Sequence, residues 1–233
     1  MTTLEGAHVL ILGATGGLGS ALCHRLAGAG ARLSLSARDP ARLASLAAEL
    51  AEEAGEGGVV TTVAADLTAP DGPRRVVDEV AGAGPLTGLV NAAGVVAFGP
   101  VAELDDDTLD DLLLLDLIAP IRLTRAALAH LGQGGFLVQL SAVVAEKPMA
   151  GMAAYSAAKA GLTAFDAALA TELRRHRIRV LDVRPPHTET GLAGRPVAGE
   201  APTLPTGLDP DAVAERIVRA ILDDERDLPA SAF

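Results

Sequence analysis

The chain is poor in aromatic residues and in cysteine. Its 233 residues include no Trp, one Tyr and four Phe, although 49% of them are hydrophobic. The core must therefore be built mainly from Ala, Val, Leu and Ile. The single cysteine, Cys23, excludes an intramolecular disulfide framework and a metal cluster held by several thiolates, and it suits a reducing compartment. A chain of this length is expected to bury a sizeable core as one domain.

Basic residues and long apolar runs are scarce as well. Nineteen basic residues stand against thirty acidic ones, which gives a net charge of −11. Because a negative surface repels phosphate backbones, we expect no nucleic acid partner. Residues 1–7 lack the basic and apolar regions of a signal peptide, and the apolar segment 112–121 is too short to span a bilayer. The sequence thus predicts a cytoplasmic protein with no membrane partner.

Short runs of branched aliphatic residues alternate with helical patterns. The strand-like runs lie at 8–12, 32–36, 59–64, 89–90, 136–140 and 179–183, and the helical patterns at 18–29, 40–54, 73–81, 104–130, 155–176 and 209–223. Continuous apolar runs are typical of parallel strands covered by helices on both faces. Strict alternation predicts an α/β fold, a doubly wound parallel sheet, with residues 1–233 in a single domain. Asp39 before Pro40 is typical of a helix start.

A glycine-rich turn joins the first predicted strand to the first predicted helix. Its residues are Gly13, Ala14, Thr15, Gly16, Gly17, Leu18 and Gly19. Glycine permits a tight turn and a close approach of the backbone to a pyrophosphate, which the N-terminus of the following helix can bind. This position favours dinucleotide binding over an ordinary loop. No Lys-Ser/Thr pair follows the glycines, which excludes a triphosphate-binding loop.

The spacing G-x-x-x-G-x-G and later motifs resemble the short-chain dehydrogenase/reductase family. The later motifs are Asp66-Leu67, Asn91-Ala92-Ala93-Gly94 and Tyr155-Ser156-Ala157-Ala158-Lys159, each at the expected place after a strand or at the start of a helix. The resemblance covers about residues 8–190. It implies a seven-stranded Rossmann sheet, a nicotinamide cofactor and hydride transfer at a carbonyl or alcohol carbon.

The residues at the end of the second predicted strand indicate which nicotinamide cofactor is used. Ala37 stands where family members that use NAD often carry Asp, and Arg38 follows it. Since a guanidinium can hold a 2′-phosphate, the sequence predicts NADP(H) in preference to NAD(H), with a solvated Arg38 as the alternative. The resemblance implies further cofactor contacts along the chain. These come from Asp66 and Leu67 at the adenine, and from Asn91, Ala92, Ala93, Pro185, Thr188 and Thr190 along the rest of the cofactor.

Tyr155 and Lys159 form the predicted chemical centre. They are four residues apart, so their side chains meet on one face of a helix. An ammonium beside a phenol favours the ionised phenol, which otherwise forms only near pH 10. The resemblance implies that Tyr155 is the general acid/base and that Lys159 also binds the nicotinamide ribose.

Two positions depart from the family pattern. Ala142 stands where the family carries its substrate-orienting Ser, and the hydroxyl of Ser141 belongs to the opposite face of the strand unless a bulge turns it. His187, beside Pro186 in the turn after the sixth strand, is another candidate donor. Losing a donor to a developing oxyanion costs about 10²–10³ in rate. Alternatives therefore stay open: an isomerase- or cyclase-like enzyme without net redox turnover, or a non-catalytic nucleotide-binding subunit.

Asp116 is the second departure, since the family carries Asn there. In the family that Asn lies in a distorted helix whose backbone carbonyl holds a water in a proton relay to the Lys. Pro120 has no N–H, so the carbonyl of Asp116 loses its partner four residues on. We hypothesise that Asp116 keeps this relay and pairs with Lys159; the alternative is a kinked packing helix.

The remaining segments concern the substrate and the assembly. Apolar residues at 95–98, 143–145 and 149–152 predict a mostly apolar small-molecule substrate, and the Gly- and Pro-rich segment 191–207 predicts a lid. The family's glycine-rich tail is missing, which leaves the last strand open. The two long predicted helices resemble the family's two-fold interface and imply a homodimer or homotetramer. The histidines lack ligand spacing, so we expect no metal site.

Overall fold

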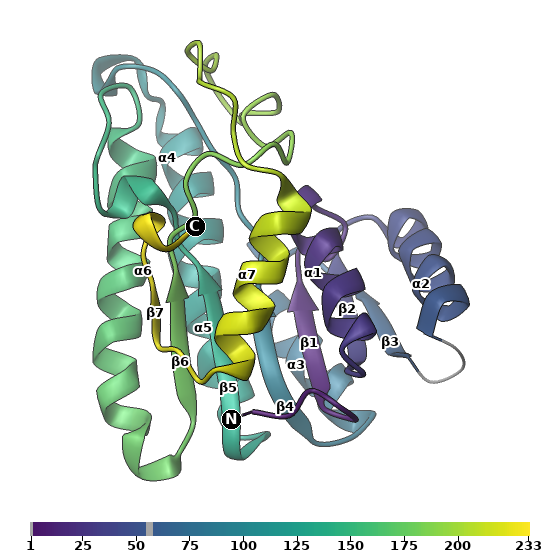
Figure 1. The fold of residues 1–233 in the computed structure, drawn as a ribbon. Coiled ribbons are helices and arrows are strands. Elements are labelled where there is room, and N and C mark those ends of the chain that lie inside the picture. The colour runs from purple at the N-terminus through teal and green to yellow at the C-terminus, as the bar shows by residue number, and fades with distance from the viewer. Residues whose placement is uncertain (1, 55–57) are drawn as a thin grey trace.

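The computed structural model describes residues 2–54 and 58–233. Its strands form a parallel sheet in the order β3-β2-β1-β4-β5-β6-β7 (Figure 1). The strands are β1 (His8–Leu12), β2 (Arg32–Ala37), β3 (Val59–Ala64), β4 (Leu86–Asn91), β5 (Leu131–Leu140), β6 (Arg179–Val183) and β7 (Asp227–Leu228). This arrangement confirms the predicted doubly wound α/β fold.

Helices cover both faces of the sheet. The α-helices are α1 (Gly17–Gly28), α2 (Pro40–Ala54), α3 (Gly72–Gly82), α4 (Asp106–Leu113), α5 (Ala119–Ala127), α6 (Ala153–Glu172) and α7 (Pro210–Leu222). A π-helical turn, η2 (Leu114–Ile118), joins α4 to α5, and short 3₁₀ turns are η1 (Val101–Glu103), η3 (Val143–Ala145), η4 (Leu173–His176) and η5 (Ala230–Ala232). Helices α1, α2 and α7 pack on one face, and α3, α5 and α6 on the other (Figure 1).

The core consists of two aliphatic layers that sandwich the sheet. All five residues of β1 are buried, with Val9 and Ile11 in the layer under α1 and α7, and Leu10 and Leu12 in the layer under α3 and α5. This alternation follows from the two-residue period of a strand. It explains why the strand reads as one continuous apolar run.

The sheet order creates the place for a binding site. Strand β1 pairs with β2 on one side and with β4 on the other, both in parallel register. The connections from these strands therefore run to opposite sides, and in open α/β sheets ligands bind at this switch point, outside the carboxyl ends of the strands.

The structure corrects the single helix predicted over 104–130. That stretch is divided among α4, the π-helical turn η2 and α5, because Pro120 cannot donate the regular helical hydrogen bond. The N–H of Ala119 donates to the carbonyl of Leu114 five residues before it, which is the π-helical pattern. No helix among the described residues is long and apolar enough to cross a membrane.

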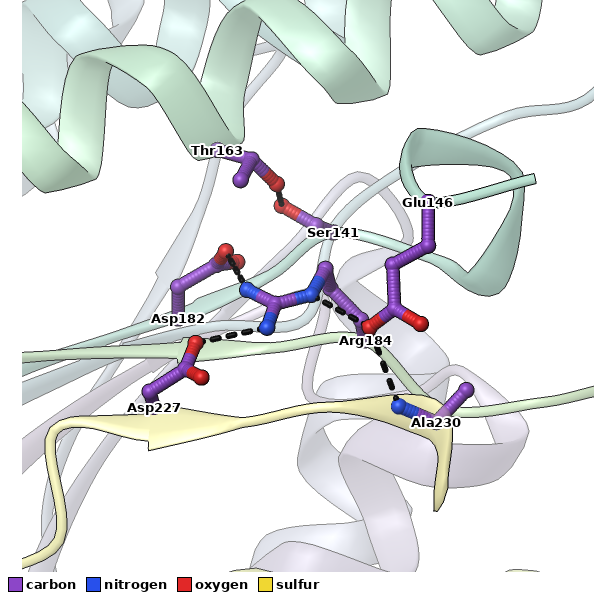
Figure 2. A network of polar contacts seen from close by, with 7 residues as sticks. All are labelled: Ser141, Glu146, Thr163, Asp182, Arg184, Asp227 and Ala230. Carbon is purple, nitrogen blue, oxygen red and sulfur yellow. Dashed lines mark hydrogen bonds and ion pairs between the residues drawn. The ribbon is translucent and has the colours of Figure 1, made fainter. Parts of the chain in front are cut away.

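Strand β7 resolves the question that the sequence leaves open. It pairs in parallel with β6, and a buried guanidinium, Arg184, holds it there (Figure 2). Arg184 forms ion pairs with Asp182, with Asp227 at 2.6 Å and with Glu146 at 2.6 Å. The Glu146 carboxylate also accepts from the N–H of Ala230 at 3.1 Å. The chain after β7 is thus tied to the turn that follows β5.

Candidate functional site

A cavity of about 570 Å³ opens at the carboxyl ends of the central strands. Most residues predicted to hold a cofactor line its wall. These are Gly13, Thr15, Gly16, Gly17, Leu18, Gly19, Arg38, Asp66, Leu67, Ala92, Ala93, Tyr155, Lys159, Pro185, Thr188 and Thr190. Two predicted site residues, Asn91 and Asp116, are buried behind this wall.

The glycine turn lies against two neighbouring loops so closely that side chains are excluded. A Cβ atom on Gly13, whose φ is +70°, would lie 2.7 Å from the backbone of Ala93. A Cβ atom on Gly17 would lie 2.7 Å from the carbonyl oxygen of Thr190. Gly16 is the N-cap of α1 and supplies no side chain to cap it. The first N–H groups of α1 are therefore presented without a competing side chain, as anion binding at a helix N-terminus requires.

Asn91 supports the loop that faces the cofactor side of the cavity. Its amide nitrogen donates to Gln139 Oε1 at 3.0 Å, and its Oδ1 accepts from the N–H of Ala93 at 3.3 Å. Gln139 in turn donates to the Thr124 hydroxyl at 3.0 Å. A buried polar chain thus fixes the loop after β4, and Asn91 acts on the cavity through Ala93.

Positive charge gathers along the cavity although the chain is acidic. Arg38, Arg42 and Arg195 line the wall with the carboxylates of Asp39 and Asp66. Both carboxylates are engaged locally. Asp39 accepts from two N–H groups at the start of α2, as predicted for a helix cap, and Asp66 accepts from the N–H and the hydroxyl of the residue two positions on. Those last two bonds hold the pKa of Asp66 below its usual range.

Arg42 and Arg38 differ in whether the protein already supplies a hydrogen-bond partner for the guanidinium. Arg42 Nη2 donates to the carbonyl of Thr15 at 2.7 Å and so braces the glycine turn. Arg38 is exposed and forms no hydrogen bond or ion pair with the described residues. Its guanidinium is therefore available for a ligand anion. The uncapped helix start and the exclusion of side chains from the turn together fit a dinucleotide.

Tyr155 and Lys159 come together on the wall, one turn apart on α6. Tyr155 is 7% exposed and Lys159 is 4% exposed, and the ammonium lies 5.8 Å from the centre of the phenol ring. Lys159 Nζ donates to the carbonyl of Leu140 at 3.0 Å and lies 3.2 Å from Asp116 Oδ1. The predicted pairing of Asp116 with Lys159 is therefore present in the structure.

Asp116 is held in the π-helical turn and is completely buried. Its Oδ1 also accepts from the N–H of Val95 at 3.2 Å. Gly94 makes this approach possible, because a Cβ there would lie 2.7 Å from Asp116 Oδ1 and 3.4 Å from Lys159 Nζ. Burial raises the pKa of Asp116, and the ammonium of Lys159 opposes that shift. An oxygen that receives two N–H donors fits the ionised carboxylate.

The structure shows where the hydroxyl beside Ala142 points. Ser141, which also lines the cavity, accepts a hydrogen bond at 3.1 Å from the hydroxyl of Thr163 on α6 (Figure 2). The pairing of β5 with β6 is regular from Phe136 to Leu140, so the last five residues of β5 before Ser141 contain no bulge. His187 does line the cavity, and its Nε2 lies 3.5 Å from Glu189 Oε1.

The other end of the cavity is apolar and is bordered by the segment 191–207. Its wall includes Val96, Phe98, Val143, Val144, Met149, Met152, Leu192, Val197 and Leu204. The segment is tied to the body of the protein at two places. The N–H of Val197 donates to Val96 O at 2.8 Å, and the N–H of Leu208 donates to His187 O at 2.8 Å.

Sequence reasoning missed several residues at or near the site. Arg195 on the cavity wall belongs to a segment that reads only as a loop. Asp166 is 1% exposed on α6, and neither of its carboxyl oxygens has a hydrogen-bond partner among the described residues. Asp166 follows Tyr155 by eleven residues, which places both on the same face of a helix. This spacing in the sequence could have identified Asp166 as a residue near the site.

Comparisons with known proteins agree with this geometry. Residues 7–200 match the family described as short chain dehydrogenase. An uncharacterized oxidoreductase of Methylorubrum extorquens is 31% identical over 235 aligned positions, which cover 97% of this chain and 94% of that protein. The crystal structure of a short chain dehydrogenase from Burkholderia cenocepacia in complex with NADP is 29% identical, with a TM-score of 0.86 over 99% of each chain.

A more distant structure shows the same fold. It is a short chain dehydrogenase/reductase from Burkholderia phymatum in complex with NAD, at 21% identity and a TM-score of 0.88, covering 99% of this chain and 90% of that one. Solved structures with this fold thus hold either nicotinamide cofactor. The family match spans most of the chain, and the sheet, the glycine turn and the Tyr-Lys pair lie within it. This chain is a member of the short-chain dehydrogenase family and an oxidoreductase of that type.

Proposed function

We propose that the protein is an NADP(H)-dependent reductase of a carbonyl, or of a related polarised double bond, in a mostly apolar small molecule. The observation that carries this proposal is the position of Tyr155 and Lys159. They stand on the cavity wall between the glycine turn on one side and an apolar surface on the other. A dinucleotide on the turn and an apolar substrate on the opposite surface would meet at the phenol.

The preference for NADP(H) rests on Arg38. Ala37 brings no carboxylate to this end of β2, and Arg38 forms no hydrogen bond or ion pair with the residues that the structure describes. The crystal structure with NADP at 29% identity supports the proposal, and the cavity's other arginines add positive charge. Replacing Arg38 with Ala should raise the Kd for NADPH at least about tenfold, since a hydrogen bond to a charged group contributes about 1.5–3 kcal/mol.

The same substitution should leave the Kd for NADH nearly unchanged, because NADH lacks the 2′-phosphate. Arg32→Ala is the matched control: Arg32 is an exposed arginine at the other end of β2, away from the cavity. Calorimetry of both variants with both cofactors measures the effect. Equal losses for NADPH and NADH in the Arg38 variant would contradict the assignment.

Each residue of the centre has a defined task in the proposed reaction. When bound, the reduced nicotinamide supplies a hydride to the carbonyl carbon. Tyr155 donates its phenol proton to the oxygen that develops charge there. The hydrogen bond to the Leu140 carbonyl fixes the ammonium of Lys159. That ammonium would also donate to the ribose of the bound cofactor. Asp116 anchors Lys159 from behind the wall.

The substrate oxygen needs a donor other than a side chain at position 142. Ala142 has no hydroxyl, and Ser141 is engaged with Thr163. Tyr155 is then the main donor in reach of the oxygen, and His187 on the cavity wall is a second. The segment 191–207 would serve as a lid that excludes water from this apolar end, since Val197 within it pairs with Val96 and Leu208 directly after it pairs with His187.

Consumption of reduced cofactor tests the proposal. Purified protein with NADPH and a panel of apolar ketones should lose absorbance at the reduced-nicotinamide band. Tyr155→Phe should lower this rate by about 10²–10⁴, the range of general acid catalysis, without changing the Kd for NADPH by more than about twofold. Binding of NADPH without consumption across the panel would contradict the reductase proposal and favour an isomerase-like enzyme or a non-catalytic nucleotide-binding subunit.

We also propose that the chain assembles as a homodimer or homotetramer through α6. The outward face of this helix is exposed and consists of small residues. It includes Ala153, Ala157, Ala164, Ala167 and Ala168. Such a face lets a second helix approach closely. A monomeric mass by light scattering at micromolar concentration would contradict this assembly.

A further inference from the structure

The positive charge of Lys159 does not face Tyr155 alone. Its ammonium lies 3.2 Å from Asp116 Oδ1, whereas it lies 5.8 Å from the centre of the Tyr155 ring. Both partners of the ion pair are almost completely inaccessible to solvent. A carboxylate so close to the ammonium opposes the effect that an isolated ammonium would have on the phenol.

The pair must be neutral overall. A buried ammonium or carboxylate without a counter-ion is costly, because it gives up its hydration without compensation. Asp116 Oδ1 receives the ammonium of Lys159 and the N–H of Val95, so the carboxylate is the natural acceptor. Tyr155 therefore stands beside a dipole of zero net charge and not beside a free cation.

Other charged groups around Tyr155 do not restore the missing positive charge. Tyr155 packs in a cluster with residues of the loop after β4, of η3 and of the segment near Leu192, and the members of that cluster are apolar. His187 faces the same cavity from the loop after β6. Asp166 lies farther along α6 and interacts with Lys159, which again adds a carboxyl and no cation. Burial first, and Asp116 second, raise the pKa of Tyr155.

We propose that Asp116 cancels the charge of Lys159 at Tyr155 and so sets the pH range of catalysis. The free site then carries a neutral phenol near neutral pH, which can donate a proton but cannot accept one. This inference rests on the proposed function. It makes Asp116 a positioning residue that moves the ionisation of Tyr155, and with it the pH dependence of both directions of the reaction, to higher pH.

The chemistry of the two directions explains this pH dependence. In reduction, the carbonyl carbon gains a hydride from the reduced nicotinamide, the carbonyl π bond breaks, and the oxygen takes the proton of Tyr155. The phenolate left behind regains a proton from water. In oxidation, the alcohol must give its proton to a phenolate, so oxidation should reach its full rate only above the pKa of Tyr155, which Asp116 keeps high by holding the charge of Lys159.

The composition of the chain allows a direct measurement. Tyr155 is the only Tyr and there is no Trp, so the ultraviolet absorbance of tyrosinate reports this one phenol. In the wild-type protein without cofactor, the titration midpoint should lie above that of free tyrosine, about pH 10. A midpoint at or below about pH 10 in the folded wild type would overturn it.

Asp116→Asn gives the sharper test. Asn keeps the size and the oxygen that accepts from Val95, but it leaves the ammonium of Lys159 without a counter-ion. The midpoint of Tyr155 should then fall by about one to two pH units, the usual effect of a nearby charge. The rate of alcohol oxidation should become maximal at a correspondingly lower pH. Asp111→Asn is the matched control, since it removes one exposed carboxylate from α4.

The outcomes separate this inference from the proposed function. An unchanged midpoint in folded Asp116→Asn protein overturns the inference, whether or not ketones are reduced. If Asp116→Asn does not fold, the double variant Asp116→Leu/Lys159→Met decides: removal of a neutral pair should leave the midpoint within about half a pH unit of the wild type, and a clear rise would overturn the inference. The expected midpoints without any nicotinamide turnover would uphold the control of the phenol by Asp116 and overturn the proposed function with its pH range of catalysis.

Discussion

The buried carboxyl of Asp166 makes the stability of this protein depend on pH in a calculable way. Asp166 lies beside Asp182 and Arg184, and neither of its oxygens has a hydrogen-bond partner among the described residues. Arg184 already serves three carboxylates, those of Asp182, Glu146 and Asp227. Burial, and after it the charge of Asp182, raise the pKa of Asp166 to about 8. The carboxyl is therefore protonated in the folded protein near neutral pH.

The sign and size of the effect follow from proton linkage. The unfolded chain releases this proton near pH 3.8, and the folded protein holds it until about pH 8. Between these values the folded state binds more protons, so the contribution of Asp166 to stability is full at low pH and is lost as the pH rises. One proton corresponds to about 1.4 kcal/mol per pH unit. From about pH 5 to about pH 7 the loss is then about 3 kcal/mol.

Asp166→Asn isolates this contribution. The amide does not titrate, and it can donate to Asp182 Oδ1, which has no hydrogen-bond partner among the described residues. Urea unfolding at several pH values should show the variant gaining stability over the wild type as the pH rises. Glu172→Gln, an exposed change on the same helix, should run parallel to the wild type. Parallel curves for Asp166→Asn and wild type would mean that Asp166 is ionised in the folded state, and the charge count around Arg184 would be wrong.

Three further substitutions test the packing around the site. Gly19→Ala would place a Cβ 2.1 Å from the carbonyl oxygen of Gly13, so the turn must shift and calorimetry should show at least about tenfold weaker binding of NADPH. Ser141→Ala removes only the partner of Thr163, so stability should fall by about 1 kcal/mol while kcat/KM for a ketone changes less than about twofold; a loss of about 10²-fold would make Ser141 the missing donor. Arg184→Met leaves Asp182 buried without its cation and should cost about 3 kcal/mol in urea unfolding, whereas no loss would show that the network contributes little.

Local patterns were enough to predict most of the fold and one side of the site. A strand that is covered on both faces must be apolar along most of its length. Strand β1 is buried at every position and apolar from Val9 to Leu12. The glycine turn could be recognised because its function depends on backbone geometry that few residues other than glycine allow. The cap at Asp39 and the pair of Tyr155 with Lys159 are similarly short-range: each needs only residues two to four positions apart.

Features that depend on partners far away in the sequence could not be predicted from local patterns. Strand β5 begins at Leu131, in a glycine-containing stretch that resembles a loop, because its pairing partner is Leu86 on β4. Strand β7 has two residues and no sequence signal of its own; Arg184 and Glu146 hold it from elsewhere in the chain. Pro120 predicted that the carbonyl of Asp116 loses its regular helical partner, but not that residues Leu114–Ile118 form a π-helical turn.

The buried charges along α6 connect the two pH experiments. Among the described residues, Lys159 is the single ammonium close to Asp116, Asp166 and the phenol of Tyr155. The guanidinium of Arg184, which also acts on Asp166, is already paired with three other carboxylates. One cation can balance only one anion. Lys159 lies 3.2 Å from Asp116 Oδ1, so its charge balances the carboxylate of Asp116. Asp166 and Tyr155 must then both keep their protons near neutral pH.

This assignment predicts different effects of two similar substitutions on one signal. Asp116→Asn should lower the titration midpoint of Tyr155, because it frees the charge of Lys159 for the phenol. Asp166→Asn replaces a carboxyl that is already neutral, so the midpoint of Tyr155 should move by less than about half a pH unit. The tyrosinate absorbance measures both variants under the same conditions. If Asp166→Asn lowers the midpoint as much as Asp116→Asn does, Lys159 is shared between two ionised carboxylates, and neither the stability profile nor the pH range of catalysis can be derived from the pair with Asp116.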